Sequence, residues 1–215
     1  MRDFLLVAAH DLRTPLSSIR AAGELVASPR LPAAEVVDLG EVIIRQADNL
    51  AALIAELAEL GRLEAGEIRA NPVDLLLGAV VAEAQEAAGP GGVEVSVEVD
   101  ADLRVRADHG HVRRILTNYL TNAHHYAGSG VRLRARSAAD SVEICVADTG
   151  PGVPPEFVAR LFDKFSRGTE GRRAAGMGLG LAIVAALAKL NGGSAWYEPN
   201  TPTGAQFWVS LPAPP

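Results

Sequence analysis

The feature that most constrains this chain is a change in the spacing of its apolar residues near residue 66. Before that point, apolar residues and glycines recur at alternating steps of three and four, which is typical of helices that pack in a coiled-coil-like bundle. Breakers over residues 28–34 predict a turn, so we expect two long antiparallel helices. The first series is Leu5, Ala9, Leu12, Leu16, Ile19, Gly23 and Val26, and the second is Val36, Gly40, Ile43, Ala47, Leu50, Ile54 and Leu57.

A second apolar line on the second predicted helix indicates that the hairpin does not stand alone. Val37, Ile44, Ala51 and Ala58 flank the main series at steps of seven. Two amphipathic helices cannot bury so wide an apolar face between them, and a second copy of the hairpin is its natural partner. We therefore expect a homodimer built on a four-helix bundle.

Residues 63–74 contain Gly66, Asn71 and Pro72 and read as a linker between two domains. Beyond the linker, helix-like and strand-like spacing alternate. This alternation indicates a mixed sheet covered by helices, an α+β sandwich that follows the all-α hairpin. We predict helices from Asp74 to Ala88, from about His109 to Tyr126 and from Leu179 to Asn191, and strands over residues 93–99, 103–107, 131–137, 141–148, 194–198 and 205–211.

Charge and composition narrow the classes of partner. The chain has 20 basic and 26 acidic residues, a net charge of −6, which argues against nonspecific binding to nucleic acid or anionic lipid. No apolar run approaches the roughly 20 residues of a membrane-spanning helix. Cys145 is the one cysteine, which excludes an intrachain disulfide, and its apolar surroundings predict a buried thiol. We expect a globular protein of a reducing compartment, with no nucleic-acid partner and no membrane segment in this chain.

The segment AHDLRTPL, residues 9–16, is the first that suggests chemistry. His10 lies one position beyond the bundle-facing Ala9, so we expect its ring on the solvent-exposed flank, with Asp11 beside it. A neutral imidazole is a nucleophile near pH 7, and a carboxylate that holds the proton on one ring nitrogen directs the lone pair of the other outward. Pro15 removes a helical hydrogen bond and predicts a kink. Taken alone, the segment favours an ordinary surface histidine in a bent helix.

Two further segments supply groups suited to a nucleotide. Asn118 and Asn122 are four residues apart on one helical face, where amide oxygens can ligate Mg²⁺, although two solvated asparagines are an equal alternative. Asp148 ends a predicted strand ahead of Gly150 and Gly152. A carboxylate there can accept a hydrogen bond from the exocyclic amine of adenine and repel the carbonyl of guanine. A plain hairpin turn is the alternative.

A run of glycines forms the fourth group. Gly176, Gly178 and Gly180 lead directly into an apolar helix, whose free backbone N–H groups would suit the phosphates of a nucleotide. The run lacks the Lys-Ser/Thr ending of a P-loop and the spacing of the dinucleotide fingerprint, which excludes those two sites. Residues 161–176 combine aromatic residues with a polar, glycine-containing stretch, as a lid over a ligand does.

The order of these groups resembles the H, N, G1, F and G2 boxes of bacterial sensor histidine kinases, and the resemblance covers nearly the whole chain. The linker RLEAGEIRANPVDL and the closing GAQFWVSLP are also similar to that family. The resemblance implies a dimerisation and histidine-phosphotransfer hairpin over residues 1–66 and a Bergerat-type catalytic ATP-binding domain over residues 72–215. The matching elements are His10 in AHDLRTPL, Asn118 with Asn122, the segment from Asp148 to Gly152, Phe162 with Phe165, and the glycine run.

In that family ATP phosphorylates the histidine, and the phosphoryl group then passes to an aspartate in the receiver domain of a response regulator. The resemblance therefore implies that His10 is the phosphoacceptor, that Asp11 orients and activates it, and that Asn122 ligates Mg²⁺. It also implies a cytoplasmic protein or the cytoplasmic portion of a membrane-anchored sensor. The implied nucleotide-binding residues are Asn118, Asn122, His125, Tyr126, Asp148, Gly150, Gly152, Phe165, Arg167, Gly176, Gly178 and Gly180.

Thr14 matches the position that assists removal of phosphate from the regulator in many members of the family. A hydroxyl there can orient the attacking water. An equal alternative is that Thr14 bonds back to the carbonyl of His10 beside the proline.

Two positions depart from the family's pattern: His125 stands where a lysine is usual, and Ala205 where a threonine is usual. A neutral imidazole attracts phosphate less than an ammonium does, so we expect modest, pH-dependent nucleotide affinity, with Arg167, Arg172 or Arg173 as a replacement charge. Two alternatives stand beside the kinase. One is a dimeric nucleotide-binding scaffold that transfers no phosphate. The other is an ATPase of the same fold that drives conformational change, although it gives the His-Asp pair no role.

Overall fold

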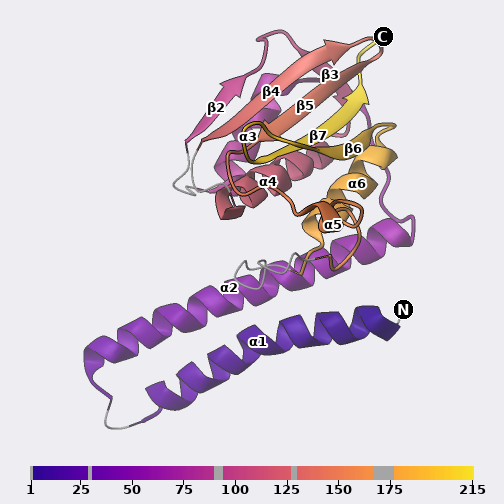
Figure 1. Cartoon of the computed structure of the whole chain (residues 1–215). Helices are drawn as coiled ribbons and strands as arrows, with labels where there is room; N and C mark the ends of the chain where they lie inside the picture. The colour runs from indigo at the N-terminus through magenta and orange to yellow at the C-terminus, as the bar shows by residue number, and fades with distance from the viewer. Residues whose placement is uncertain (1, 29–30, 90–93, 127–129, 167–176) are drawn as a thin grey trace.

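The computed structural model of the chain describes residues 2–28, 31–89, 94–126, 130–166 and 177–215. It shows a long helical hairpin followed by an α/β domain that lies along one end of the hairpin (Figure 1). The predicted two-part architecture is therefore confirmed. Within the described ranges, no helix combines the length and the apolar character needed to cross a membrane.

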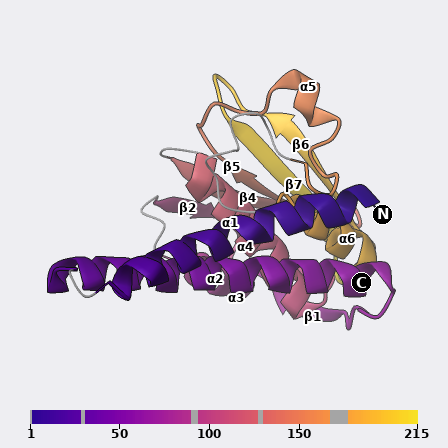
Figure 2. The same cartoon turned by 90° about the horizontal axis from the view of Figure 1, so that it is seen from below.

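The hairpin consists of α1 (Arg2–Val26) and α2 (Ala33–Glu64), which run antiparallel and side by side (Figure 2). Helix α2 begins directly after Pro32, with an acidic residue in its first turn and a basic one in its last, which suits the helix dipole. It ends where Gly66 adopts φ +67°, a left-handed conformation that turns the chain away from the helix axis.

Within one chain, the buried line on α1 lies one residue before the predicted one. Ala8, Pro15 and Ala22 are buried, whereas Ala9 and Leu16 are exposed. A helix in a four-helix bundle faces one neighbour in its own chain and another in the partner copy, so a single hairpin buries only one edge of the apolar face. On α2, the residues predicted to widen that face are all exposed: Val37, Ile44, Ala51 and Ala58.

The α/β domain opens with a small antiparallel sheet of β1 (Val73–Leu76) and β3 (Arg104–Ala107). The predicted helix from Asp74 is therefore wrong over its first three residues. They form a strand because they pair with β3, and Asp74 accepts a hydrogen bond from Arg106 at 2.8 Å. The helix begins at Leu77, whose N–H donates to the carbonyl of Leu103 at 2.9 Å.

The main sheet has five strands in the order β2-β4-β5-β7-β6, with β2 parallel to β4 and the other neighbours antiparallel. Helices α3, α4 and α6 cover one of its faces (Figure 1). The strands and long helices predicted beyond residue 90 are confirmed, and among the residues described there only the short α5 was not anticipated. The bounds are α3 (Leu77–Ala88), β2 (Val95–Glu98), α4 (His109–Tyr126), β4 (Val131–Ala138), β5 (Ser141–Ala147), α5 (Pro155–Val158), α6 (Gly180–Leu190), β6 (Ser194–Pro199) and β7 (Ala205–Pro212).

The core lies between these helices and the sheet. Tyr119 on α4 is fully buried there, with its ring 5.6 Å from that of Phe207. Its hydroxyl donates to the backbone carbonyl of Trp208 at 2.7 Å, so α4 is tied to β7 by a buried hydrogen bond. This tie fixes the helix that carries Asn118 and Asn122 against the middle of the sheet.

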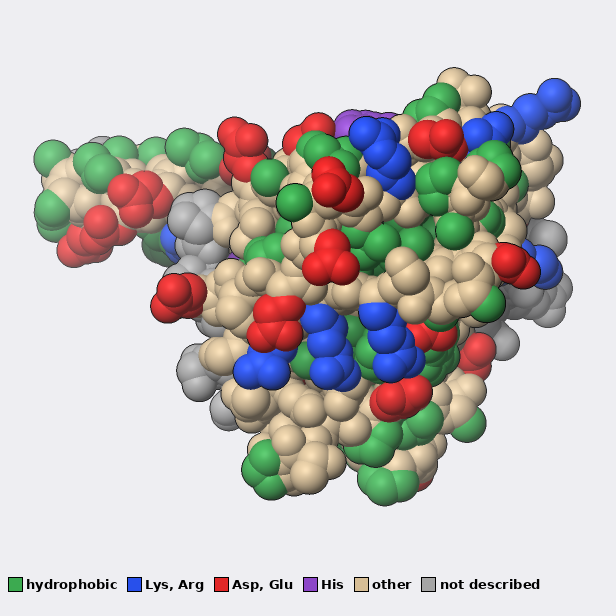
Figure 3. All heavy atoms as spheres, turned by 90° about the horizontal axis from the view of Figure 1, so that it is seen from above, with side chains coloured by type: hydrophobic (Ala, Val, Ile, Leu, Met, Phe, Trp, Pro, Cys, Tyr) green, Lys and Arg blue, Asp and Glu red, His purple; other side chains and the backbone are tan. Residues whose placement is uncertain are grey.

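The opposite face of the sheet carries a stack of aromatic and cationic side chains. Trp196 and Trp208 stack with ring centroids 5.7 Å apart, and the guanidinium groups of Arg134 and Arg136 each lie 5.1 Å from the Trp208 ring. Figure 3 shows basic and acidic side chains gathered on the upper face of the molecule. Cys145 is buried beside this stack, and burial raises the pKa of its thiol to about 11. The predicted burial of this cysteine is confirmed.

The last turns of α2 attach the hairpin to the α/β domain. Leu53 and Leu60 are buried and belong to the same apolar cluster as the core of that domain. Glu59 pairs with Arg114 of α4 at 3.0 Å, and Glu64 pairs with Lys164. The domain is therefore held along the C-terminal part of α2.

Candidate functional site

His10 projects from α1 into solvent. Its side chain is 78% exposed, and its Nδ1 lies 3.0 Å from Oδ1 of Asp11, whose own side chain is only 12% exposed. The only hydrogen bond of the His10 ring within the described part of the chain is this one, so Nε2 stays accessible. The pair therefore presents a ring nitrogen outward while a carboxylate can hold the proton on the other nitrogen.

Thr14 lies one turn further along α1. Its hydroxyl donates to the carbonyl of His10 at 3.4 Å, a long hydrogen bond. The helix continues through Pro15, whose ring is buried and which donates no backbone hydrogen bond. The local bond that we expected as the alternative for Thr14 is thus present, and it leaves the hydroxyl on the same helical turn as His10.

Asn118 on α4 is the first residue of the candidate nucleotide pocket. It is 8% exposed, and its Nδ2 is buried with no hydrogen-bond partner in the described structure. A buried amide donor without a partner costs free energy unless a ligand satisfies it. Gly180 starts α6 directly beside it, because a Cβ at Gly180 would lie 3.4 Å from Oδ1 of Asn118. Because Gly180 has no side chain, the start of α6 can lie directly against this amide.

Asn122 follows one turn later on α4. It is half-buried, and its side chain makes no hydrogen bond to any described residue. His125 and Tyr126 are exposed at the end of the helix, with their rings edge to face and 6.5 Å between centroids. In the described ranges, no cluster of three or more His, Cys, Asp or Glu side chains could hold a metal ion. The amide oxygens fit a cation only if other ligands, such as phosphate oxygens and water, complete its coordination.

Asp148 lies directly after β5 and is 4% exposed. Its Oδ1 accepts hydrogen bonds from the backbone N–H of Gly150 at 2.9 Å and of Ala205 at 3.2 Å. Burial raises the pKa of this carboxyl, and the two amide hydrogen bonds oppose that shift. Oδ2 accepts no hydrogen bond from the described residues, so one carboxylate oxygen remains for a ligand donor.

The backbone around Asp148 leaves no room for extra side chains. Gly152 has φ +76°, and a Cβ there would lie 2.9 Å from the carbonyl oxygen of Gly204. A Cβ at Gly204 would itself clash with the carbonyl oxygen of Asp148. Asn200 donates to that same carbonyl at 2.7 Å. Sequence reasoning gave Asn200 and Gly204 no role. Their only signal was a turn-rich stretch, which does not reveal that this turn returns to Asp148.

Phe165 and Gly178 connect the segment after α5 to the start of α6. Phe165 adopts φ +61°, and its N–H donates to the carbonyl of Gly178 at 3.0 Å. Gly178 has φ +68°, which glycine adopts at little cost. The candidate residues Arg167 and Gly176, with most of the predicted lid, lie outside the described residues.

The structure thus brings the predicted nucleotide residues together in local groups: Asn118 with Gly180, Asp148 with Gly150, and Phe165 with Gly178. It places His10 on the hairpin, and no hydrogen bond or ion pair of the described residues joins it to those groups. His10 and the candidate nucleotide pocket therefore belong to different parts of the chain.

Two family models match the chain. Residues 1–66 match the His Kinase A phospho-acceptor domain, and residues 107–215 match the family of histidine kinase-, DNA gyrase B- and HSP90-like ATPases. The chain belongs to the histidine kinase family. In this histidine kinase, the range of the first model contains His10 and Asp11, and the range of the second contains Asn118, Asp148 and Gly180.

Individual relatives agree with this assignment. Over 99% of its length, this histidine kinase is 34% identical to the sensor-like histidine kinase SenX3 of Mycobacterium tuberculosis, of which it covers 54%. Over 95% of its length, it is 34% identical to the signal transduction histidine-protein kinase/phosphatase MprB of Mycolicibacterium paratuberculosis, of which it covers 42%. The chain spans about half the length of these relatives.

A solved structure shows the same fold. The histidine kinase AdeS of Acinetobacter baumannii superimposes on this histidine kinase with a TM-score of 0.78, covering 96% of this chain and 98% of that one. The two sequences are 22% identical, so this likeness concerns the fold alone.

Proposed function

We propose that this histidine kinase transfers the γ-phosphoryl group of ATP to His10 and then to an aspartate in the receiver domain of a response regulator. The observation that carries the proposal is the 3.0 Å contact between Nδ1 of the exposed His10 and the largely buried Asp11. In this proposal, residues 1–66 form the dimerisation and phosphotransfer domain, and residues 72–215 form the catalytic ATP-binding domain.

The His10–Asp11 pair supplies the nucleophile for this reaction. Because Nδ1–H donates a hydrogen bond to the Asp11 carboxylate, the lone pair resides on Nε2, which attacks the γ-phosphorus. The bond from phosphorus to the bridging oxygen breaks, and ADP leaves. The carboxylate of Asp11 stabilises the positive charge that develops on the ring. Attack by a carboxylate oxygen of the regulator then breaks the phosphorus–nitrogen bond and returns His10.

The nucleotide pocket divides its roles between base and phosphates. Oδ2 of Asp148 accepts a hydrogen bond from the exocyclic amine of adenine. Nδ2 of Asn118 and the backbone N–H groups beyond Gly178 face the phosphates. Asn122 would hold Mg²⁺, which would supply charge neutralisation at the phosphates.

We also propose that the chain is a homodimer. Ile44 is 63% exposed and Val37 62% exposed, and they lie on one line with Ala51 and Ala58 along α2. Burial of this line against a second hairpin would remove a continuous apolar stripe from water. The match of residues 1–66 to the phospho-acceptor domain supports the same arrangement.

Incubation with ATP labelled on its γ-phosphate tests the proposal. The parent chain should take up an acid-labile, base-stable label, and H10Q should take up none while binding ATP with unchanged affinity. A label that persists in H10Q would show that another residue is the acceptor. A parent chain that binds ATP but takes up no label would favour the nucleotide-binding scaffold. Phosphotransfer from the labelled parent to a panel of receiver domains then identifies the regulator.

A second activity, removal of phosphate from the regulator, is supported by one relative and one residue. MprB is described as a kinase/phosphatase. In this chain, Thr14 lies within hydrogen-bond reach of the His10 backbone, on the turn that follows the nucleophile. In this reaction the Thr14 hydroxyl orients the water that attacks the aspartyl phosphate.

A further inference from the structure

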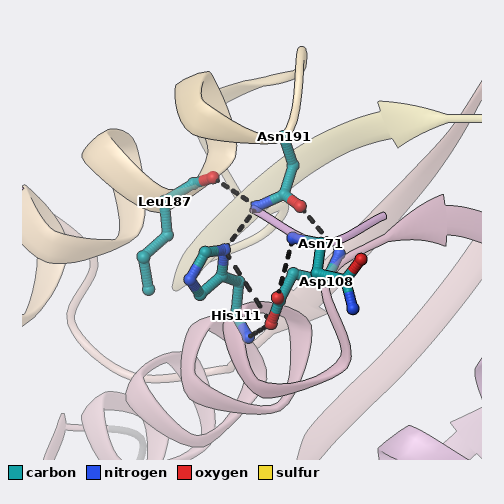
Figure 4. Close-up of polar contacts among 5 residues, drawn as sticks. All are labelled: Asn71, Asp108, His111, Leu187 and Asn191. Carbon is teal, nitrogen blue, oxygen red and sulfur yellow. Dashed lines mark hydrogen bonds and ion pairs between the residues drawn. The ribbon is translucent and has the colours of Figure 1, made fainter. Parts of the chain in front are cut away.

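A polar network, which we call the clasp, joins three segments that are distant in the sequence (Figure 4). It consists of the side chains of Asp108, His111 and Asn191 with the backbone groups of Asn71 and Leu187. Asn71 belongs to the linker, Asp108 and His111 to the start of α4, and Asn191 to the end of α6. None of these residues belongs to the nucleotide pocket described above.

The hydrogen bonds of Asn191 fix the orientation of its amide. Its Oδ1 accepts the N–H of Asp108 at 2.8 Å, so its Nδ2 is the donor. That Nδ2 donates to the carbonyl of Leu187 at 2.8 Å and to Nδ1 of His111 at 3.1 Å. Nδ1 of His111 must therefore carry a lone pair. Asn191 is 7% exposed, and all its donors and its acceptor are used inside the protein.

Asp108 extends the clasp to the linker. Its Oδ1 accepts the N–H of His111 at 3.1 Å and caps the first turn of α4, and its Oδ2 accepts the N–H of Asn71 at 3.0 Å. Burial raises the pKa of Asp108, but the backbone hydrogen bonds from Asn71, His111 and Gly110, with the nearby His111 ring, together lower the pKa below its usual value. The carboxylate is therefore held charged between the linker and the helix.

Helices α4 and α6 connect the clasp to the nucleotide pocket. Helix α4 starts at the clasp and carries Asn118 about 15 Å along its axis. Helix α6 starts at Gly180, beside Asn118, and ends at the clasp with Asn191. The two helices are thus an antiparallel pair with the clasp at one end and the pocket at the other. A shift of one helix along the other would move Gly180 relative to Asn118.

We propose that Asp108 and Asn191 are positioning residues that couple the linker to the nucleotide pocket by fixing the register of α4 against α6. The inference rests on the proposed nucleotide-binding function, which it deepens: the position of the linker, which leads from the hairpin, sets the affinity of the pocket for ATP. The hydrogen-bonding groups of the Asn191 amide and of the Asp108 carboxylate are all engaged within the clasp, so it has one preferred geometry and can hold such a register.

The linker bond can be removed without touching either helix. N71P deletes the backbone N–H that donates to Asp108, whereas N71A keeps it. The Asn71 side chain makes no hydrogen bond in the described structure, so N71A removes no other polar contact. In the full chain, N71P should weaken binding of an ATP analogue about three- to tenfold by calorimetry, and N71A should bind like the parent. The KM for ATP in autophosphorylation should rise with N71P, while kcat stays near that of the parent.

Hydrogen exchange without nucleotide separates this inference from the proposed function. N71P should speed the exchange of backbone amides in the first turn of α6 relative to N71A. Equal exchange of the two variants there overturns the coupling, whatever the parent binds. Failure of the parent to bind ATP contradicts the proposed function by itself and leaves this comparison intact.

A double-variant cycle guards against misfolding of N71P. N191L removes the centre of the clasp and should weaken ATP binding at least as much as N71P does. If both act through one network, N71P/N191L should bind no more weakly than N191L alone. If the losses of ATP affinity caused by N71P and N191L multiply in the double variant, the two residues do not act through one network. If the variants have lower melting temperatures but bind ATP as the parent does, the clasp only stabilises the fold.

Discussion

Nδ1 of His10 and Oδ1 of Asp11 lie 3.0 Å apart on consecutive residues of one helix, with the ring in solvent and the carboxylate largely covered. This arrangement allows one ring nitrogen to keep its proton while the other faces solvent. His10 lies on the hairpin, away from the candidate nucleotide pocket, so the nucleophilic role proposed for His10 and the binding role proposed for the pocket can be tested separately.

Replacing Asp11 tests the nucleophile. D11N keeps a hydrogen-bond acceptor but removes the negative charge that stabilises the imidazolium, so autophosphorylation of His10 should slow by about 10²-fold or more. The affinity for ATP, measured by calorimetry, should not change, because Asp11 lies on the hairpin. A D11N chain that labels at the parental rate would show that Asp11 has no part in activating His10.

Replacing Asp148 tests recognition of the base. The amide oxygen of D148N must face the N–H groups of Gly150 and Ala205, so its NH₂ faces the adenine amine, donor against donor. A mispaired buried group costs about 1–3 kcal/mol, which is roughly 5- to 150-fold in the dissociation constant for ATP. Unchanged ATP affinity in a D148N chain with a parental melting temperature would contradict the assigned role.

Replacing Gly204 tests the close packing of its turn against the backbone of Asp148. G204A places a methyl group against the carbonyl of Asp148 at φ +118°, so the free energy of unfolding should fall by about 2–4 kcal/mol and ATP binding should weaken. G78A is the matched control, because a Cβ at Gly78 on α3 meets nothing within 4 Å. G78A should stabilise the protein slightly in urea titrations. Equal stability of the two variants would refute the steric argument.

Thr14 separates the two reactions proposed for the hairpin. T14A should keep autophosphorylation of His10 and slow the removal of phosphate from the cognate regulator, because the orienting hydroxyl is lost. The measurement is the decay of labelled regulator in the presence of ADP. Identical decay with mutant and parent would leave Thr14 as a residue that only bonds to the His10 carbonyl.

Ile44 tests the dimer. I44E places a charge in the centre of the exposed apolar line on α2, so sedimentation equilibrium should show monomers where the parent forms dimers. V97E changes an exposed apolar residue on β2, far from that line in the fold, and should remain dimeric. Dissociation by both substitutions, or by neither, would contradict the assigned interface.

The sequence by itself determined the long helices, most strands, the exposure of His10 and the burial of Cys145. Each of these follows from the spacing of apolar residues along a short stretch of chain. In a regular helix or strand, side chains at a fixed spacing in the sequence point to the same face, so the spacing of apolar residues identifies the buried face. Composition likewise excluded an intrachain disulfide, since a single cysteine has no partner.

Only the tertiary structure decided which segments meet. Asp74 lies in a strand because its segment pairs with Arg104–Ala107, although the spacing of apolar residues around Asp74 suits a helix. Asn200 and Gly204 close around the backbone of Asp148, and in the clasp Asp108 is hydrogen-bonded both to Asn71 and to Asn191. These contacts join residues dozens of positions apart. These contacts form only when the fold brings distant segments of the chain together. The local pattern of side chains around each residue does not specify which distant segment it will contact.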